Sequence, residues 1–349
     1  MAEHVLITGG AGFIGSHLGD ELLLAGYRVR ALDSLVEQVH GDAKRPDYLT
    51  DEIELIGGDV RNPEVVRGAL EGIDSVVHLA ARVGVGQSMY QPAEYAAANT
   101  AGTGVLLEGL LDQPVRKLLV ASSMSIYGEG AYEPAPPTER TREQLARGEW
   151  DPRGPNGEML TPVPTPETKE PSLASVYALT KYDQERMCLL YGAAYEVPTV
   201  ALRFFNVYGP RQALSNPYTG VPAIFATRLL NDRRPLVYED GGQRRDFVNV
   251  ADVARACRLA LEREGADGRP REHRPGPEHI RARDRRDPRA GARQGNQARA
   301  GRQVPRRRHP SLLRRRHARP RGARVRGDGA ARGRDGRAGR VARGPGRRD

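Results

Sequence analysis

Tyr177 and Lys181 have the side-chain types and the spacing for acid–base chemistry at an oxygen atom. On a helix, residues four apart lie on the same face. A phenol has a reference pKa of about 10, so it acts as a base near neutral pH only when a nearby cation stabilises the phenolate. The ammonium of Lys181 is such a cation. Tyr–Lys pairs are also common on helix surfaces, so the surrounding elements must decide between the two interpretations.

Those elements alternate between strand and helix patterns from the start of the chain. Buried-strand patterns occur at residues 5–7, 29–32, 53–56, 75–79, 117–121 and 199–203, and helix patterns occur at residues 16–25, 63–70, 100–111 and 176–195. This alternation predicts an α/β fold in which helices cover both faces of a doubly wound parallel sheet. Ligands bind beyond the carboxyl ends of such strands, so a hydroxyl partner for Tyr177 is expected in residues 121–128.

A glycine-rich turn follows the first strand. Gly9, Gly12 and Gly15 allow a tight turn, a close approach to a pyrophosphate and close packing of the helix on the strand. The helix start that faces the diphosphate carries Phe13 and Ile14. Asp33 ends the second strand, where a carboxylate accepts hydrogen bonds from the adenosine ribose and repels a 2′-phosphate. The pattern predicts a Rossmann domain that binds NAD rather than NADP.

The glycine spacing, Asp59 with Val60, the His-Leu-Ala-Ala run at residues 78–81 and Asn99 together resemble the extended short-chain dehydrogenase/reductase family of NAD-dependent sugar epimerases and dehydratases. The resemblance implies that Asp59 and Val60 lie near the adenine. It places Leu79, Ala80 and Ala81 along the cofactor. It makes Asn99 a structural or proton-relay residue. Without the family, Asp59 and Asn99 could be ordinary loop caps.

The same resemblance selects the third catalytic residue. In the family a Ser or Thr lies four residues before the Tyr of a Tyr-Gly pair, which here is Ser123, with Ser122 as the alternative. Its hydroxyl would bond the substrate oxygen at C4, beside Tyr177 and Lys181, which also contact the cofactor. The 4,6-dehydratases carry Asp-Glu directly after this residue, whereas this chain has Met124 and Ser125. We therefore expect C4 epimerisation, with oxidative decarboxylation, dehydration and a catalytically impaired binding protein as alternatives.

The substrate side resembles the family in two segments. Within residues 203–211, Asn206 would contact the sugar diphosphate, and within residues 241–253, Arg245 would bind the pyrophosphate. The guanidinium fork suits a diphosphate, although Arg245 could instead form a surface ion pair with Asp246. Residues 81–88 and 215–220 resemble a deoxyhexose subgroup, the dTDP-L-rhamnose 4-epimerase-like enzymes, beside the UDP-glucose 4-epimerase-like enzymes. The family implies a nucleotide-sugar substrate and a homodimer.

Residues 131–171 are rich in Pro, Gly and charge, which indicates either a small functional insertion or a flexible surface loop. Relatives often carry a Cys pair where this chain has Gly154 and Gly157, so we expect no metal. We predict an NAD-binding domain over residues 1–180 that includes this insertion. Residues 181–268 would complete the sheet and begin a smaller substrate lobe.

Charge is distributed unevenly. The chain has a net charge of +10, and residues 269–349 contain 28 Arg and 7 Asp or Glu, a balance of +21. The preceding residues therefore carry 10 − 21 = −11, which disfavours nucleic acid as a specific partner. The only cysteines are Cys188 and Cys257. A strand that starts at residue 4 leaves no room for a secretion signal, and apolar runs are too short to span a membrane, so we expect a cytoplasmic protein.

Residues 269–349 contain no Phe, Tyr, Trp or Lys. Taken at face value they form a disordered polycation, which could bind nucleic acid electrostatically. Reading common codons for residues 303–316 from each second base admits Lys-Tyr-Arg-Val-Gly-Asp-Ile-Arg-His-Cys-Phe-Ala-Asp. This string resembles a segment near the C-terminus of family members, which carries an Arg for the substrate diphosphate. We therefore expect a frameshift near Gly268.

Overall fold

The computed structural model describes residues 2–42, 44–213 and 220–263. The chain divides into two units, Met1–Arg286 and Asp287–Asp349, and every described residue belongs to the first unit. The expectations for residues 215–219 and for the Arg-rich tail at 269–349 lie outside the described residues.

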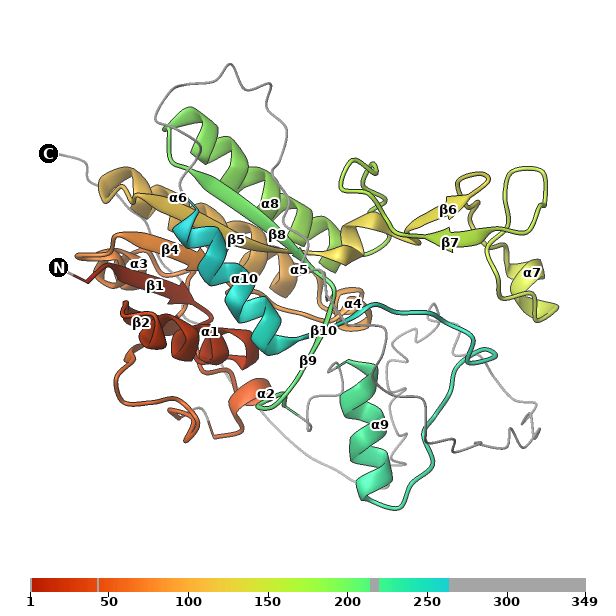
Figure 1. The fold of residues 1–349 in the computed structure, drawn as a ribbon, viewed down its shortest axis with the longest axis horizontal. Helices are drawn as coiled ribbons and strands as arrows, with labels where there is room; N and C mark the ends of the chain where they lie inside the picture. Colours follow the sequence, from red (N-terminus) through yellow and green to blue (C-terminus); the bar gives the residue numbers. More distant parts are fainter. Residues whose placement is uncertain (1, 43, 214–219, 264–349) are drawn as a thin grey trace, which may run out of the picture. The chain divides into compact units, whose positions relative to one another are not determined.

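A parallel sheet forms the centre of the described chain (Figure 1). Its strands are β1 (His4–Thr8), β2 (Arg28–Asp33), β3 (Glu54–Gly57), β4 (Ser75–His78), β5 (Lys117–Ser123) and β8 (Thr199–Phe204). They lie in the order β3-β2-β1-β4-β5-β8, and each neighbouring pair is parallel. This order confirms the predicted doubly wound fold. The progression of the strand order changes direction between β1 and β4, while the strands themselves stay parallel. Sheets of this kind bind dinucleotides at that point.

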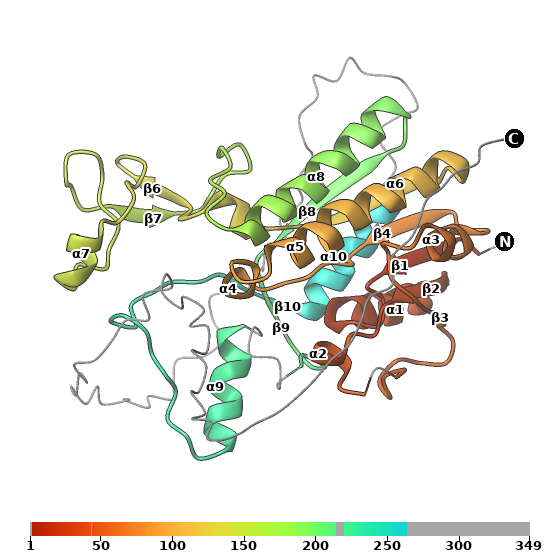
Figure 2. The ribbon, with the colours of Figure 1, turned by 180° about the vertical axis from the view of Figure 1, so that it is seen from behind.

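Helices cover both faces of the sheet (Figures 1 and 2). One face packs against α1 (Phe13–Leu24) and α10 (Val250–Glu262), and the other packs against α3 (Pro63–Leu70), α6 (Gly102–Asp112) and α8 (Val176–Ala194). Successive strand side chains point to opposite faces. Val5 and Ile7 of β1 therefore join the first hydrophobic core, and Leu6 joins the second. Burial on both faces explains why the strands are almost continuously apolar.

Polar caps fix where the helices begin. Asn62 accepts a hydrogen bond from Glu64 N at 3.0 Å, directly before Pro63 at the first helical position of α3. Ser175 accepts from Ala178 N at 3.1 Å and so sets the start of α8. Such caps satisfy amide groups that have no partner inside the helix. The start of α8 matters most, because it carries Tyr177.

Two helix starts differ from the sequence expectation. Helix α1 begins at Phe13, directly after Gly12, whose extended backbone (φ −72°, ψ 179°) ends the glycine turn. Helix α6 begins at Gly102 and follows a π-helical turn, η1 (Ala96–Ala101). Such turns are often found at functional sites. The described chain also contains the short elements α2 (Glu37–His40), α4 (Val85–Ser88), α5 (Pro92–Tyr95) and η2 (Met124–Tyr127).

Residues 131–171 form a small insertion with its own structure. It contains β6 (Ala131–Glu133), α7 (Arg142–Ala146) and β7 (Thr161–Val163), with β6 and β7 antiparallel. A Cβ added to Gly154 would lie 2.2 Å from the carboxylate of Glu158, which is the flexible end of that side chain. Across the described ranges, His, Cys, Asp and Glu side chains form no group of three or more that could hold a metal ion.

A second, two-stranded sheet follows β8 in the sequence. Strands β9 (Asn206–Tyr208) and β10 (Phe247–Asn249) pair in parallel, and α9 (Val221–Leu230) lies between them in the sequence. In the part of the chain that the structure describes, no helix is long and apolar enough to span a bilayer.

Candidate active site

Tyr177 lies in the first turn of α8. Its backbone N–H donates to Ser88 Oγ at 3.0 Å, so the loop after β4 fixes the start of this helix. Its ring contacts Tyr95 edge-on, with the ring centroids 6.4 Å apart and an interplanar angle of 87°. The phenol is therefore held by packing as well as by its helix.

Ser123 ends β5 beside the Tyr177 phenol. Burial raises the pKa of Tyr177, and the interaction with the Ser123 hydroxyl offsets part of this rise. Ser125 lies where the dehydratases carry the Glu of their Asp-Glu pair, and its Oγ donates to Ser123 Oγ at 2.9 Å. The structure thus brings together the predicted serine and tyrosine at the carboxyl end of the sheet.

The alternative serine, Ser122, points into a different network. Its hydroxyl donates to Glu185 Oε2 at 2.6 Å. The Glu185 carboxylate also pairs with the Arg203 guanidinium at 2.6 Å, and both side chains are buried. This pair joins α8 to β8. The geometry therefore favours Ser123, not Ser122, as the partner of Tyr177.

Lys181 lies one turn after Tyr177 and is only 3% exposed. Its ammonium donates to Gln184 Oε1 at 2.5 Å. Burial lowers the pKa of Lys181 to about 8. Sequence analysis missed Gln184, because a glutamine three residues after a lysine carries no motif of its own.

For each glycine of the turn after β1, the structure shows whether chain packing alone requires the absence of a side chain. A Cβ at Gly15 would lie 2.3 Å from Gly9 O, and a Cβ at Gly9, whose φ is +71°, would lie 2.9 Å from Ala80 N. Chain packing therefore explains these two glycines. At Gly12 an added Cβ would meet only Gly9 O, at 3.3 Å. Gly12 opens α1, which has no side-chain cap. A glycine that packing does not require, beside uncapped amides, fits the close approach of a diphosphate.

Asp33 ends β2 beside this turn. Its carboxylate accepts from Ala11 N at 3.1 Å and from Leu35 N at 2.9 Å. His40 Nε2 lies 3.5 Å from Asp33 Oδ1, and the His40 side chain is 2% exposed. This histidine was not predicted from the sequence, since only the fold of the loop brings it to the carboxylate. Phe13 and Ile14 occupy the first turn of α1 and are partly exposed.

The remaining predicted cofactor residues line the carboxyl ends of β3 and β4. Arg61 holds the Asp59 carboxylate through Nη2 at 2.7 Å and keeps the pKa of Asp59 below its usual range. Asn99 is fully buried in η1; its Oδ1 accepts from Arg82 N at 2.6 Å, and its amide donates to Thr180 Oγ1 at 3.0 Å. Asn99 therefore ties the loop after β4 to α8. Val60 is buried. Leu79, Ala80 and Ala81 directly precede the loop that Asn99 holds.

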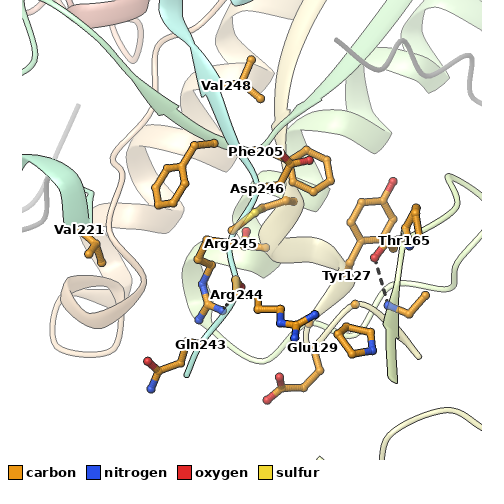
Figure 3. A pocket seen from close by; sticks show the side chains of 18 of the residues that line it. Tyr127, Glu129, Thr165, Phe205, Val221, Gln243, Arg244, Arg245, Asp246 and Val248 are labelled. Atoms are coloured by element: carbon orange, nitrogen blue, oxygen red, sulfur yellow. Dashed lines mark hydrogen bonds between the residues drawn. The ribbon is translucent and has the colours of Figure 1, made fainter. Parts of the chain in front are cut away.

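The predicted substrate residues lie on β9 and on the segment that precedes β10. The Asn206 amide donates to Asp246 O at 3.1 Å, which joins β9 to the segment before β10. Arg245 is exposed on that segment and lines a hollow that Met124 and Ser125 also line. Figure 3 shows Arg244, Arg245 and Glu129 among the side chains that line this hollow. Ser123 and Tyr177 are not among the lining residues, although the hollow reaches the neighbours of Ser123.

The family model described as NAD dependent epimerase/dehydratase family matches residues 5–155 and 154–272. The chain belongs to this family. The predicted family resemblance is thereby confirmed, and the cofactor of the family is NAD. The matched region ends at residue 272, close to the point where the composition of the chain changes.

Among curated proteins, the chain is 37% identical over 273 residues to a dTDP-L-rhamnose 4-epimerase from Burkholderia thailandensis, covering 75% of this chain and 74% of that protein. It is 32% identical over 262 residues to a UDP-N-acetyl-alpha-D-glucosaminuronate decarboxylase from Bacillus cytotoxicus, covering 75% of this chain and 72% of that protein. The relatives thus include two of the reaction types that the sequence left open, epimerisation and decarboxylation.

Solved structures with this fold include two epimerases. UDP-glucose 4-epimerase from Thermotoga maritima, with UDP-glucose, matches with a TM-score of 0.61 and 32% identity over 74% of this chain and 73% of that chain. UDP-glucose 4-epimerase from Thermus thermophilus, in complex with NAD, matches with a TM-score of 0.59 and 35% identity over 74% of each chain. They confirm the Rossmann architecture, and the glycine cradle of this chain fits the same cofactor.

Proposed function

We propose that this protein is a nucleotide-sugar 4-epimerase that acts on a dTDP- or UDP-hexose through transient oxidation at C4. The observation that carries the proposal is the placement of Ser123 beside the Tyr177 phenol at the carboxyl end of β5, with Lys181 buried one turn further along α8. The glycine turn at the carboxyl end of β1 supports a dinucleotide beside this group.

The proposed chemistry needs one proton acceptor at the sugar. Tyr177 Oη takes the proton of the C4 hydroxyl and later returns it. The Ser123 hydroxyl bonds the same oxygen, and the Lys181 ammonium favours the phenolate. When bound, NAD supplies the acceptor and donor for the hydrogen on C4. Because no net oxidation results, the cofactor is retained between turnovers.

Dehydration is disfavoured by the residues after Ser123. Loss of water needs a proton donor and a proton acceptor beyond C4. Met124 offers neither, and the Ser125 hydroxyl is bonded to Ser123. Decarboxylation is the second candidate, supported by the similarity to the Bacillus cytotoxicus decarboxylase. The first candidate is preferred because the more similar curated relative is the dTDP-L-rhamnose 4-epimerase.

On the substrate side, Arg245 would hold the diphosphate and Asn206 would position its segment. In support, Arg245 is exposed on the hollow that reaches Ser125, and Asn206 binds the backbone of residue 246. Purified protein incubated with UDP- and dTDP-hexoses, including uronic acids, tests the proposal by NMR. C4 epimers support it; carbon dioxide release or a 6-deoxy-4-keto product would assign one of the alternatives.

We also propose a homodimer that uses the outer faces of α6 and α8. Leu179 and Leu190, three helical turns apart on α8, are 46% and 60% exposed, and Leu111 of the neighbouring α6 is 49% exposed. A dimer would bury this surface. Sedimentation should show a dimer that Leu190→Glu dissociates; a wild-type monomer would reject the proposed dimer.

The cytoplasmic location stays part of the proposal, supported by two buried thiols, Cys188 and Cys257.

Finally, we propose that the sequence after about Gly268 is read in the wrong frame. The family match ends at residue 272, and aromatic residues and lysine are absent from residues 269–349. We also keep, as part of this proposal, the domain boundaries predicted at residues 180 and 268. A one-base change near the codon for Gly268 should raise turnover. Equal turnover of the two versions would reject the frameshift.

A further inference from the structure

Gln184 contacts the Lys181 ammonium from the next turn of α8. The Lys181 Nζ–Gln184 Oε1 distance is 2.5 Å, and Gln184 is fully buried. The amide nitrogen of Gln184 lies 3.2 Å from Ala80 O, 2.9 Å from Thr103 Oγ1 and 3.0 Å from His78 Nε2. The side chain therefore joins α8 to the carboxyl end of β4 and to α6.

These neighbours fix the orientation of the Gln184 amide. Turning it over would place its NH2 group against an ammonium and its oxygen against the Ala80 carbonyl. Both contacts would be repulsive. The two amide hydrogens must then go to Ala80 O and to either Thr103 or His78. In either case Oε1 faces Lys181 as an acceptor.

His78 completes this cluster without adding charge. Its ring bonds Thr8 Oγ1 at 2.7 Å and Thr103 Oγ1 at 2.9 Å, and Thr103 donates onward to Asn99 O at 2.6 Å. Burial and the nearby Lys181 lower the pKa of His78 to about 3, so its ring is neutral at physiological pH.

The other titratable groups that act on Lys181 come from α8. Burial raises the pKa of the Cys188 thiol to about 12, so this group is neutral too. The Glu185 carboxylate is paired with Arg203. The direct partner of the Lys181 ammonium is thus a neutral amide, held from three sides.

We propose that Gln184 is a positioning residue that holds the Lys181 ammonium in place without neutralising it, so that the positive charge acts on Tyr177. The inference rests on the proposed function, since it deepens the role of Lys181 in the same site. A carboxylate in place of the amide would keep the acceptor and the shape, but it would pair with the ammonium. The phenolate of Tyr177 would then lose part of its stabilisation.

The test compares Gln184→Glu with Gln113→Glu. Gln113 follows α6 near the amino ends of the strands, where its amide donates to Arg67 O, so the control adds the same charge away from the cluster. In Gln184→Glu, the rise of kcat with pH should move upward by about one unit, and turnover lost at neutral pH should return at higher pH. Equal losses at every pH, or the same shift in both variants, would overturn the proposal.

A second measurement does not depend on turnover. Ultraviolet difference titration of tyrosinate, with each variant compared with its Tyr177→Phe counterpart, isolates the titration of Tyr177. Its midpoint should be higher in Gln184→Glu than in wild type, and an unchanged midpoint would overturn the proposal even if the enzyme proves not to be an epimerase. A wild type without epimerase activity would reject the proposed function alone.

Gln184→Met is a second test variant, needed in case the buried negative charge prevents Gln184→Glu from folding. Methionine keeps the length of the side chain but gives the ammonium no acceptor. Circular dichroism should show a folded protein, and kcat should fall at least tenfold while KM changes little. A folded Gln184→Met protein with wild-type kcat would show that Lys181 needs no partner, contrary to the proposal.

Discussion

The side of the site that carries Tyr177 and the side that carries Arg245 are built differently. Lys181 and Ser123 are at most 7% exposed, on a strand and a helix held by capped turns and cross-strand hydrogen bonds. Arg245 is exposed, and it lies on the segment that precedes a strand of three residues.

The contrast fits the roles proposed for the two sides. The pKa of a phenol or an ammonium shifts most where water is excluded and neighbours are fixed, so the proposed acid–base groups benefit from a rigid, buried setting. A guanidinium is charged in any setting and binds a diphosphate as well from the surface. Changes on the buried side should therefore reduce kcat, and changes on the exposed side should raise KM.

Replacing Tyr177 with Phe should have the largest effect. The ring and its packing stay, and only the proton acceptor is lost, so kcat should fall by about 10²–10⁴-fold while NAD affinity changes little. Tyr182→Phe, which removes a hydroxyl further along the same helix, is the control. Steady-state kinetics and NAD titration measure both, and normal turnover in Tyr177→Phe would exclude this residue from the mechanism.

Arg245→Ala should raise KM for the nucleotide sugar by about tenfold or more and leave kcat close to wild type, because a charge-assisted bond to the diphosphate is lost in ground and transition states alike. Arg244→Ala is the matched control, since both arginines are exposed and line the same hollow. If the two variants raise KM equally, Arg245 has no special role. If Arg245→Ala lowers kcat alone, the division between the two sides is wrong.

Asp33→Asn tests the cofactor choice with less damage than removing the whole side chain, because the side chain keeps its shape and one oxygen acceptor, for either the Ala11 or the Leu35 amide. Loss of the carboxylate charge should shift the ratio of NADP to NAD affinity by about tenfold towards NADP. Asp42→Asn, on the same loop and exposed, should leave the ratio unchanged. Binding titrations with both cofactors measure it, and an unchanged ratio in Asp33→Asn would contradict the role of the charge.

The smallest effect concerns stability. His78 has a pKa of about 3 in the folded protein against a reference value of 6.5, so the unfolded chain binds its proton first as pH falls. Folding stability must then decrease on acidification between these values, by up to about 1.4 kcal/mol per pH unit from this one group. His78→Gln should show a shallower decrease in urea unfolding. Equal slopes in wild type and His78→Gln would contradict the assignment.

Sequence patterns predicted most of the fold because the signals are local. Each strand of the central sheet is a short apolar run. Tyr177 and Lys181 are four residues apart, and the three glycines of the turn lie within seven residues. For residues 131–171 the sequence left two interpretations open, an insertion or a flexible loop. Its two strands have three residues each, which is too short to show a periodic pattern.

The contacts that sequence could not supply join distant segments. Gln184 lies 106 residues from His78, and 104 from Ala80, yet it bonds both. His40 reaches Asp33 only because the loop after β2 folds back. Neither side chain belongs to a recognisable motif, and only the packed sheet and helices show what each one touches.

The most direct test of the central claim follows the hydrogen on C4. A nucleotide sugar that the enzyme converts is synthesised with deuterium at C4, and the epimer is examined by mass spectrometry and NMR. The account predicts that deuterium stays at C4 of the epimer, because the hydrogen removed from that carbon returns to its other face. Loss of the label to water, or its appearance at another carbon, would contradict transient oxidation at C4.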